Sequence, residues 1–318
     1  FARTAHTRLL MQKYEAMGKT SMPIAIAFGC VPVVPFVTGA HISRKVSEYE
    51  IIGAIQQEPL EIIKCEISDL EVPATAEIVL EGELLLDPAT FLPEGPFGEY
   101  PGTYVSLTPK PKNVFQVNCV THREDPILHL HMEGIGAILP KAKPWPWLEM
   151  IPLWHALENN EVPGITGIYP GDSLGWPHSV FVSINNMYYG HSRQIATTIW
   201  STPGIHHLGK IIVVVDSDVD ITNSNAVLTA IGTRIRPSED IVIFPGTAGG
   251  ALDPSTSPEI LKIIRGGRWD RVLIDATWPI EWEPREEWGG ERHPPYCNAT
   301  KEMLEKVRRR WSEYGLSV

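Results

Sequence analysis

The pattern of hydrophobic positions changes near the middle of the chain. Before about residue 140, several apolar runs alternate with polar residues, as in ATAEIVLEGELLL (74–86) and NVFQVNCVTHR (113–123). A period of two is typical of half-buried antiparallel strands. We expect further strands at 22–29, 59–67 and 126–133, and helices at 7–17 and 47–55. This part is therefore predicted to be a mostly antiparallel sheet or barrel with helices attached.

Later strands are apolar at nearly every position. SVFVSI (179–184) and KIIVVVD (210–216) are such runs, which are typical of strands buried on both faces. Further strands are expected at 240–245 and 271–277, and helices at 191–199, 225–233 and 300–314. Because strands and helices alternate, this part is predicted to be an α/β domain.

A Pro- and Trp-rich segment, KAKPWPW (141–147), separates the two patterns. LEMIPLWHALEN (148–159) follows with helical spacing, and Pro163 and Gly164 end it. We therefore predict an α/β (α+β) fold in three parts. They are a first domain at 1–140, a linker helix within 141–162, and an α/β domain with a terminal helix at 163–318.

Composition narrows the class of protein. The net charge is −11 and no basic stripe is visible, which argues against a nucleic-acid or anionic-membrane partner. Four cysteines without a C-x-x-C pair indicate reduced thiols and a cytoplasmic protein. No apolar run reaches the ~18 residues of a transmembrane helix. FARTAHTRLL at the start lacks a signal-peptide layout.

Two acids lie in a turn-rich segment, LPEGPFGEYPGTY (92–104). Its Pro and Gly residues fix the turn, so Glu94 and Glu99 are held in a stiff frame. One carboxylate could pair with a cation while the other, less solvated, carries a proton. On spacing alone, a surface turn with two solvated acids remains an alternative.

An acidic alternation at Asp216, Asp218 and Asp220 resembles the start of an EF-hand loop. Ile221 stands where that loop needs Gly, and Val227 stands where it needs Glu, so the pattern argues against calcium. We predict instead a polar strand end that caps a helix.

His129 and His131 are two residues apart and would share one face of a strand. Without a third ligand, we interpret them as pocket lining or core rather than a metal site. The chain contains no P-loop, nucleophile elbow, HExxH motif or dinucleotide fingerprint.

Several motifs resemble those of one family. EGPFGEYPGTY is similar to the EGPFGE(F/Y)xGYY signature of the UbiD family of prenylated-FMN-dependent decarboxylases. AMGKTSMPIAIAFG, the long block beginning VSEYEIIGA, and VDSDVDI followed by TRIRP also resemble family segments. The resemblance extends from about Ala5 to Pro237.

This resemblance implies a split β-barrel that binds the flavin at 1–140, a linker helix at 141–162, and an oligomerisation domain at 163–318. It also implies that the family's N-terminal third is absent from this sequence. The expected assembly is a homo-oligomer, either a dimer or a hexamer.

The resemblance also implies site residues. Glu99 matches the catalytic acid, and Glu94 matches its partner, which pairs with an Arg that lies before residue 1. His6 and Glu48 match ligands of a Mn²⁺ (or Mg²⁺) ion that bridges to the cofactor phosphate, and K⁺ is a further candidate ion. Without the resemblance, His6 would be a helix-start residue and Glu48 an acid that favours the helix dipole.

The implied reaction is reversible non-oxidative decarboxylation of an aromatic, heteroaromatic or α,β-unsaturated acid, releasing CO2. A flavin prenyltransferase would supply the prenylated FMN. Asn185 departs from the family, because a phosphate-binding Lys is usual there. Ala5 stands where cinnamate-type members often have Gln. His129, His131 and Met132 fall in the segment that lines the family's substrate pocket.

A second hypothesis is a non-catalytic scaffold-type subunit of a multi-subunit carboxylase, in which Asn185 reflects lost cofactor binding. We favour the enzyme because Glu94, Glu99, His6 and Glu48 are all retained.

Overall fold

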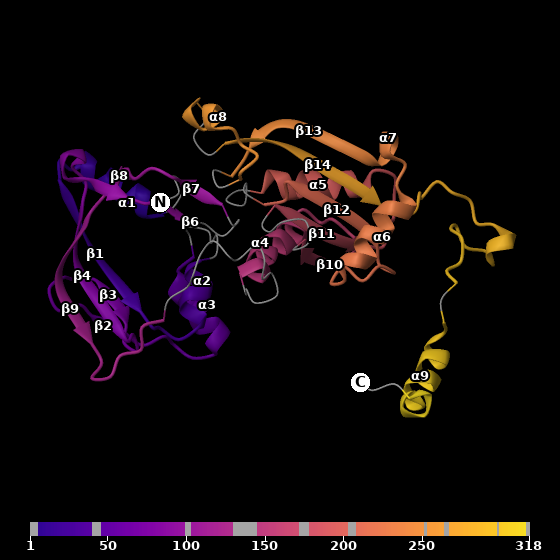
Figure 1. Ribbon diagram of the computed structural model, residues 1–318, viewed down its shortest axis with the longest axis horizontal. Helices are drawn as coiled ribbons and strands as arrows, with labels where there is room; N and C mark the ends of the chain where they lie inside the picture. The colour runs from indigo at the N-terminus through magenta and orange to yellow at the C-terminus, as the bar shows by residue number, and fades with distance from the viewer. Residues whose placement is uncertain are drawn as a thin grey trace.

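A computed structural model describes residues 6–39, 46–98, 103–129, 145–171, 178–202, 208–250, 253–263, 267–297 and 299–315. Figure 1 shows an N-terminal lobe, a C-terminal lobe built around a larger sheet, and a tail that ends in a helix away from both. The mixed α/β fold is as predicted.

The N-terminal lobe is built on a three-stranded antiparallel sheet in the order β1-β4-β9. These strands are β1 (Ser21–Phe28), β4 (Ile78–Leu85) and β9 (Phe115–His122). A bulge interrupts the β4–β9 pairing between Glu81 and Gly82. There the carbonyl oxygen of Gln116 would lie 1.9 Å from a Cβ on residue 82, so only glycine fits.

Smaller elements surround this sheet. Three two-stranded ribbons pair β2 (Ile62–Lys64) with β3 (Glu71–Pro73), β5 (Leu92–Glu94) with β8 (Lys110–Lys112), and β6 (Phe97–Gly98) with β7 (Tyr104–Ser106). The remaining elements are α1 (His6–Ala16), α2 (Val33–Thr38), α3 (Glu48–Gln56) and the short helix η1 (Pro88–Thr90). The longer helices join apolar clusters: Met11 and Tyr14 of α1 pack on Met22, and Ile52 of α3 packs with α2.

The strand expected at 126–133 is wrong for its described part. Residues 126–129 are irregular, and residues 130–133 lie outside the described residues. The N–H of Ile127 donates to the Glu77 carboxylate (3.1 Å), and Glu77 also pairs with Arg123 (3.2 Å). This side-chain anchor takes the place of strand pairing at that position.

The C-terminal lobe contains a five-stranded sheet in the order β10-β11-β12-β14-β13. Its strands are β10 (Ile165–Pro170), β11 (Ser179–Ile184), β12 (Ile211–Asp216), β13 (Ile241–Ala248) and β14 (Arg268–Ala276). The three central strands are parallel, and the two edge strands run antiparallel to them. The sequence prediction missed β10, whose Gly167 and Pro170 interrupt the apolar pattern.

Helices cover both faces of this sheet. α4 (Trp145–Asn159) and α5 (His191–Ser201) bury Leu153 and Ile195 against one face, whereas α6 (Ser224–Arg234) buries Val227 against the other. Two short helices, α7 (Pro237–Asp240) and α8 (Pro258–Ile263), complete the lobe. Because helices lie on both sides, every residue of β11 is buried, as its apolar run predicts.

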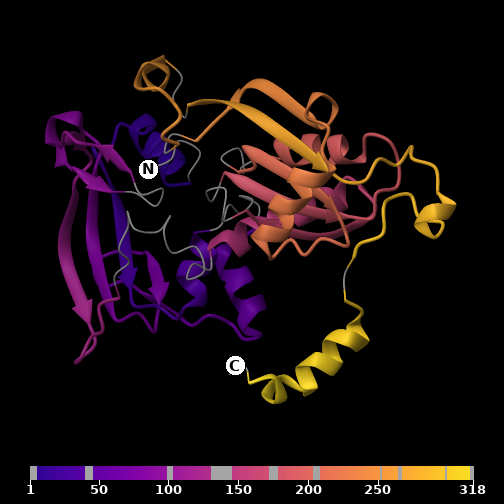
Figure 2. The same ribbon diagram turned by 45° about the vertical axis from the view of Figure 1, so that its right-hand side comes forward.

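The tail carries η5 (Glu286–Trp288), α9 (Lys301–Arg309) and η6 (Trp311–Tyr314). Thr300 caps α9 by accepting the N–H of Met303 (3.2 Å). Figures 1 and 2 both show α9 apart from the two lobes. None of the described helices combines the length and the apolar character needed to cross a bilayer.

Candidate active site

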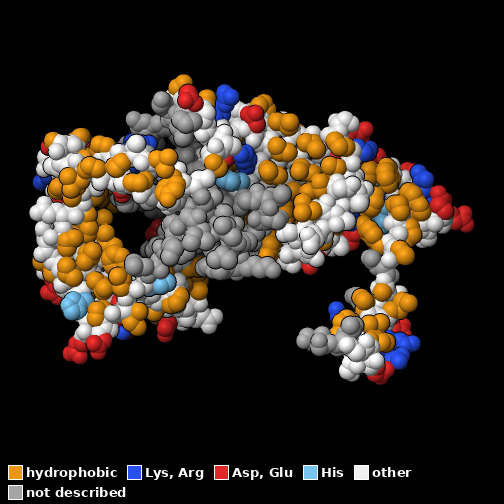
Figure 3. All heavy atoms as spheres, in the orientation of Figure 1, with side chains coloured by type: hydrophobic (Ala, Val, Ile, Leu, Met, Phe, Trp, Pro, Cys, Tyr) orange, Lys and Arg blue, Asp and Glu red, His pale blue; other side chains and the backbone are white. Residues whose placement is uncertain are grey.

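The N-terminal lobe is hollowed. Figure 3 shows an opening beside its sheet, with hydrophobic side chains along the sheet side. Large exposed hydrophobic side chains are numerous in this lobe. Among them are Ile62, Ile63, Ile67, Leu92, Tyr104, Leu107, Val117, Val120, Ile127 and Leu128. An apolar hollow of this kind is the usual setting for a ring-shaped cofactor or substrate.

Glu48 is placed by the start of α3. Ser47 is the N-cap of this helix, and its side chain accepts the N–H of Tyr49 (3.3 Å). The Glu48 side chain is half-buried in the first turn, where the helix dipole favours a negative charge. The Tyr49 hydroxyl donates to the carbonyl of Glu71 (3.3 Å), which fixes α3 to β3.

His6 is the first residue of α1, but its side chain lies outside the described part, as does Ala5. Among the described residues, no group of three His, Cys, Asp or Glu side chains forms a metal cluster. The expected ligands still fit chemically, since one imidazole with carboxylate oxygens suits Mn²⁺ or Mg²⁺. The shared metal site of His6 and Glu48 therefore stays a prediction.

Glu94 ends β5, directly opposite Lys110 of β8, and its side chain is exposed. Gly95 follows with φ +98°, a conformation that favours glycine. Glu99 lies outside the described residues. The strands on either side of it, β6 and β7, are paired with each other.

The substrate-pocket candidates are described only in part. His129 is exposed in an irregular segment after β9, so its described neighbourhood is not a strand. His131 and Met132 lie outside the described residues. The pairing of the two histidines on one strand face is thus not supported at His129, and their role in a pocket stays a prediction.

Asn185 follows β11 at the edge where the parallel strands end. Ser217, which follows β12, donates its hydroxyl to Asn185 Oδ1 (2.8 Å). Asn186 donates to Thr277 Oγ1 (3.1 Å) and to the carbonyl of Trp278 (3.3 Å) beyond β14. Carboxyl ends of neighbouring parallel strands form the usual ligand-binding edge of such a sheet. The exposed Asn185 amide is therefore oriented, but it carries no charge.

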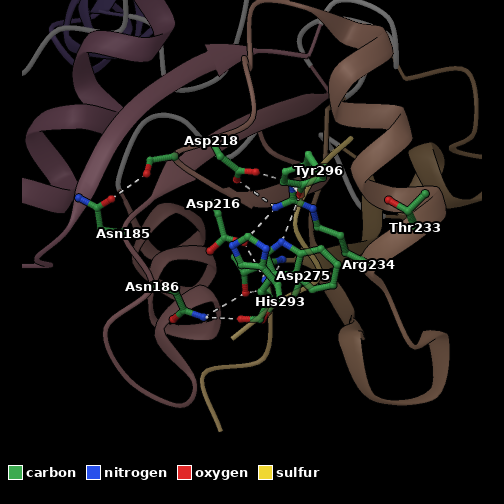
Figure 4. A network of polar contacts seen from close by, with 12 residues as sticks. Asn185, Asn186, Asp216, Asp218, Thr233, Arg234, Asp275, His293 and Tyr296 are labelled. Carbon is green, nitrogen blue, oxygen red and sulfur yellow. Dashed lines mark hydrogen bonds and ion pairs between the residues drawn. The ribbon is translucent and has the colours of Figure 1, made fainter. Parts of the chain in front are cut away.

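A buried guanidinium is the centre of the polar network in Figure 4. Arg234, at the end of α6, is 8% exposed and donates to Asp216 Oδ2 (3.0 Å) and to both oxygens of Asp218 (3.2 and 2.8 Å). Burial raises the pKa of Asp216 to about 6, although Trp278 N–H and Arg234 oppose the shift. The pKa of Asp218 is lowered, because hydrogen bonds and charge from Arg234 outweigh its burial.

This network corrects one prediction and adds residues that sequence reasoning missed. The helix after β12 is capped by Asn223, which accepts the N–H of Asn225 (3.1 Å), and not by the alternating acids. Asp220 instead closes a local turn onto Thr222. The sequence did contain a signal for this ion pair. Asp216 and Asp218 form a D-x-D pattern at the end of a strand, and Arg234 ends the helix that follows that strand.

A cavity of about 130 Å³ lies beside this edge, next to the N-terminus of α5. Two arginines line the described part of this cavity, and they are held differently. Arg193 donates to the carbonyl of Glu239 (3.2 Å), and Arg236 pairs with Glu239 (2.8 Å) and Asp240 (3.1 Å). In the described lining, Arg236 is therefore neutralised by two carboxylates, whereas Arg193 is held by a carbonyl and keeps its charge.

Each of the two lobes matches a model of one protein family. Residues 2–135 match the family model described as the UbiD 3-octaprenyl-4-hydroxybenzoate carboxy-lyase Rift-related domain. Residues 145–276 match the C-terminal domain of the same carboxy-lyase. The chain belongs to the UbiD family.

Curated relatives include two phenolic acid decarboxylases. The one from Sedimentibacter hydroxybenzoicus is 33% identical over 94% of this chain and 59% of its own length. The one from Bacillus subtilis (strain 168) is 32% identical over 90% of this chain and 57% of its own length. The chain thus spans less than two thirds of these relatives.

Solved structures agree with this assignment. The UbiD-class enzyme HmfF from Pelotomaculum thermopropionicum, in complex with FMN, has a TM-score of 0.78 at 28% identity, over 99% of this chain and 64% of that chain. The apo 3,4-dihydroxybenzoic acid decarboxylase AroY from Klebsiella pneumoniae has a TM-score of 0.76 at 26% identity, over 99% of this chain and 63% of that chain.

Proposed function

We propose that the protein containing this chain is a UbiD-type carboxy-lyase that decarboxylates an aromatic, heteroaromatic or α,β-unsaturated acid with prenylated FMN. The main support for this proposal is the structural similarity of both lobes, over 99% of the chain, to a UbiD-class enzyme in complex with FMN. The phenolic acid decarboxylases among its relatives favour an aromatic acid. The reaction is reversible in principle, because no redox equivalent is consumed.

Glu99 and Glu94 are the residues to which we assign the proton chemistry. Prenylated FMN, when bound, supplies the electron sink that makes loss of CO2 feasible. Glu99 delivers the proton to the carbon that loses CO2, acting as a general acid. Glu94 stays ionised and pairs with a cation, which separates the roles of the two carboxyl groups.

The cofactor would be held from both lobes. His6 and Glu48 would bind a Mn²⁺ or Mg²⁺ ion at its phosphate, with K⁺ as a further candidate ion. Asn185, oriented by Ser217, would meet the phosphate through a neutral amide. A neutral donor gives a weaker hydrogen bond to phosphate than a lysine does, so this contact should be less sensitive to salt.

Substrate positioning remains a proposal for Ala5, His129, His131 and Met132. A histidine could hydrogen-bond a phenol or a ring heteroatom.

We also propose the three-part division into a partial cofactor domain at 1–140, a linker at 141–162, and an oligomerisation domain at 163–318. A cytoplasmic homo-oligomer, dimer or hexamer, supplied by a flavin prenyltransferase, completes this proposal.

Replacing Glu99 tests the proposal directly. In Glu99→Gln, turnover should fall to background while flavin remains bound, because the change removes only the transferable proton. CO2 release and flavin absorbance of the full-length protein, produced with a flavin prenyltransferase, are the measurements. Glu124→Gln, an exposed acid of the same lobe, is the matched control and should retain activity. Full turnover in Glu99→Gln would refute the assignment of the acid.

A scaffold-type subunit of a multi-subunit carboxylase is the second candidate, and the uncharged Asn185 is the observation that favours it. Native mass spectrometry of the full-length protein separates the two. A protomer that carries prenylated FMN and a divalent metal supports the enzyme, whereas a flavin-free protomer that joins another subunit supports the scaffold.

A further inference from the structure

The chain leaves β12 through a tight turn, residues 216–219, which makes polar contacts on two sides. The N–H of Val219 donates to the carbonyl of Asp216 (3.1 Å) and closes the turn. Ser217, the second residue of the turn, donates its hydroxyl to Asn185 Oδ1 (2.8 Å). Figure 4 shows Nδ2 of Asn185 on the far side of the amide from this bond. The position of the turn therefore sets the direction in which Asn185 offers its N–H donors.

A single guanidinium holds the turn from the other side. Arg234, at the end of α6, donates to Asp216 Oδ2 (3.0 Å) and to Oδ1 and Oδ2 of Asp218 (3.2 and 2.8 Å). In Figure 4 the Asp218 carboxylate points toward Arg234 and away from Asn185. The two acids flank Ser217 in the sequence, so Arg234 binds the turn on both sides of that serine. A planar guanidinium fixes two carboxylates in direction as well as in distance, which a point charge does not do.

Aromatic rings shield this guanidinium from water. It lies 5.1 Å from the ring centroid of Trp278 and 5.7 Å from that of Tyr296, and it also donates to the Tyr296 hydroxyl. The backbone N–H of Trp278 adds a second bond to Asp216 Oδ2 (2.7 Å). Because Arg234 is 8% exposed, its bonds to the acids are less weakened by solvent than those of a surface ion pair. The turn therefore has a stiff support on the side opposite Asn185.

The charge of Arg234 matters as well as its shape. Asp216 and Asp218 carry negative charge on both sides of Ser217, and uncompensated carboxylates there would repel a phosphate beside Asn185. Arg234 offsets part of this charge through its ion pairs with both acids (3.0 and 2.8 Å). A variant that keeps the positive charge but loses the planar fork therefore separates the geometry of this support from its charge.

We propose that Arg234 is a positioning residue for the cofactor phosphate. By holding Asp216 and Asp218, it keeps Ser217 against Asn185, so that the Nδ2 donors of Asn185 are already oriented when the phosphate binds. The inference rests on the contact between Asn185 and the phosphate that we proposed above. An amide oriented in advance loses less rotational freedom on binding than a free one, which offsets part of the missing charge at position 185.

A double-mutant cycle on FMN affinity tests this role in flavin-free, full-length protein. Arg234→Lys keeps the charge but cannot bind both acids as the fork does, so the Kd for FMN should rise by up to about threefold. In a Ser217→Ala background the same change should have no effect, because the bond that transmits it is already absent. Fluorescence titration measures the Kd, and thermal unfolding shows that each variant is folded. An equal loss of affinity in both backgrounds would mean a merely structural role and would overturn the proposal.

Asp218→Asn is the second variant, in case Arg234→Lys does not fold. The Asp218 side chain is 40% exposed, and the change keeps its size while weakening its hold on Arg234. Loss of the negative charge acts on FMN equally in both backgrounds, so a difference between the backgrounds measures position alone. Arg271→Lys, at a buried position of β14, is the matched control. It should lower the unfolding temperature, and its effect on the Kd should not depend on Ser217.

Asn185→Ala distinguishes a failure of this inference from a failure of the proposed function. If Asn185→Ala weakens FMN binding while the effects of Arg234→Lys and Asp218→Asn do not depend on Ser217, only the role of Arg234 is overturned. If Asn185→Ala leaves the Kd unchanged, the proposed phosphate contact fails, and the role of Arg234 fails with it.

Discussion

The two lobes bury their sheets differently. All residues of β11 are buried, because α4 and α5 cover one face of that sheet and α6 covers the other. In β9, by contrast, Val117 and Val120 are 42% and 53% exposed, and the lobe that contains β9 is hollow. The C-terminal lobe therefore forms a core from its own helices. The residues expected to do the chemistry belong mainly to the lobe that leaves apolar surface open.

The largest expected effect is a loss of stability in the core of the C-terminal lobe. Phe181→Ala, in a fully buried position of β11, should destabilise this lobe by about 3–5 kcal/mol through loss of packing and a new cavity. Val120→Ala in β9 should cost less than about 0.5 kcal/mol, because the side chain is half exposed. Urea unfolding of both variants is the measurement. Equal costs would contradict the contrast between the lobes.

An intermediate effect concerns the buried acid of the N-terminal lobe. Glu81 is 1% exposed and accepts the N–H groups of Glu66 (2.8 Å) and Ile67 (3.0 Å). Glu81→Gln should cost about 1–2 kcal/mol in unfolding free energy, since one N–H loses its acceptor. The exposed Glu61→Gln is the control. A neutral result at Glu81 would mean that this lobe does not depend on its polar anchor.

The smallest effect concerns the contact that we propose between Asn185 of the C-terminal lobe and the cofactor phosphate. Ser217→Ala removes the bond that orients Asn185 and should weaken FMN binding by about threefold, or roughly 0.6 kcal/mol. The same change in an Asn185→Ala background should then have no effect, and FMN fluorescence titrations measure both. If Ser217→Ala weakened FMN binding equally in both backgrounds, Ser217 would not act through Asn185.

Local periodicity predicted most of the architecture. Alternation in 74–86 and 113–123 predicted the strands β4 and β9, and unbroken apolar runs predicted β11 and β12. These patterns succeed because each records which faces of a strand are buried. β10 was missed because glycine and proline dilute its pattern, and the strand at 126–129 failed because Glu77 holds that backbone.

The site was less predictable. The resemblance supplied Glu94, Glu99, His6 and Glu48, since no spacing rule derives a metal site from residues so far apart in sequence. The contacts of Arg234 were missed for the same reason. Asp216 and Tyr296 are 80 positions apart in the numbering, and only the folded chain places both beside Arg234.

Gly82 has a consequence for laboratory evolution of this chain. The carbonyl of Gln116 occupies the space of any side chain at position 82, while the open hydrophobic positions nearby have room to vary. A library that randomises residue 82 would lose most of its members to misfolding before any selection for a new acid begins. A recombination library can exchange segments freely only if the parents share this glycine.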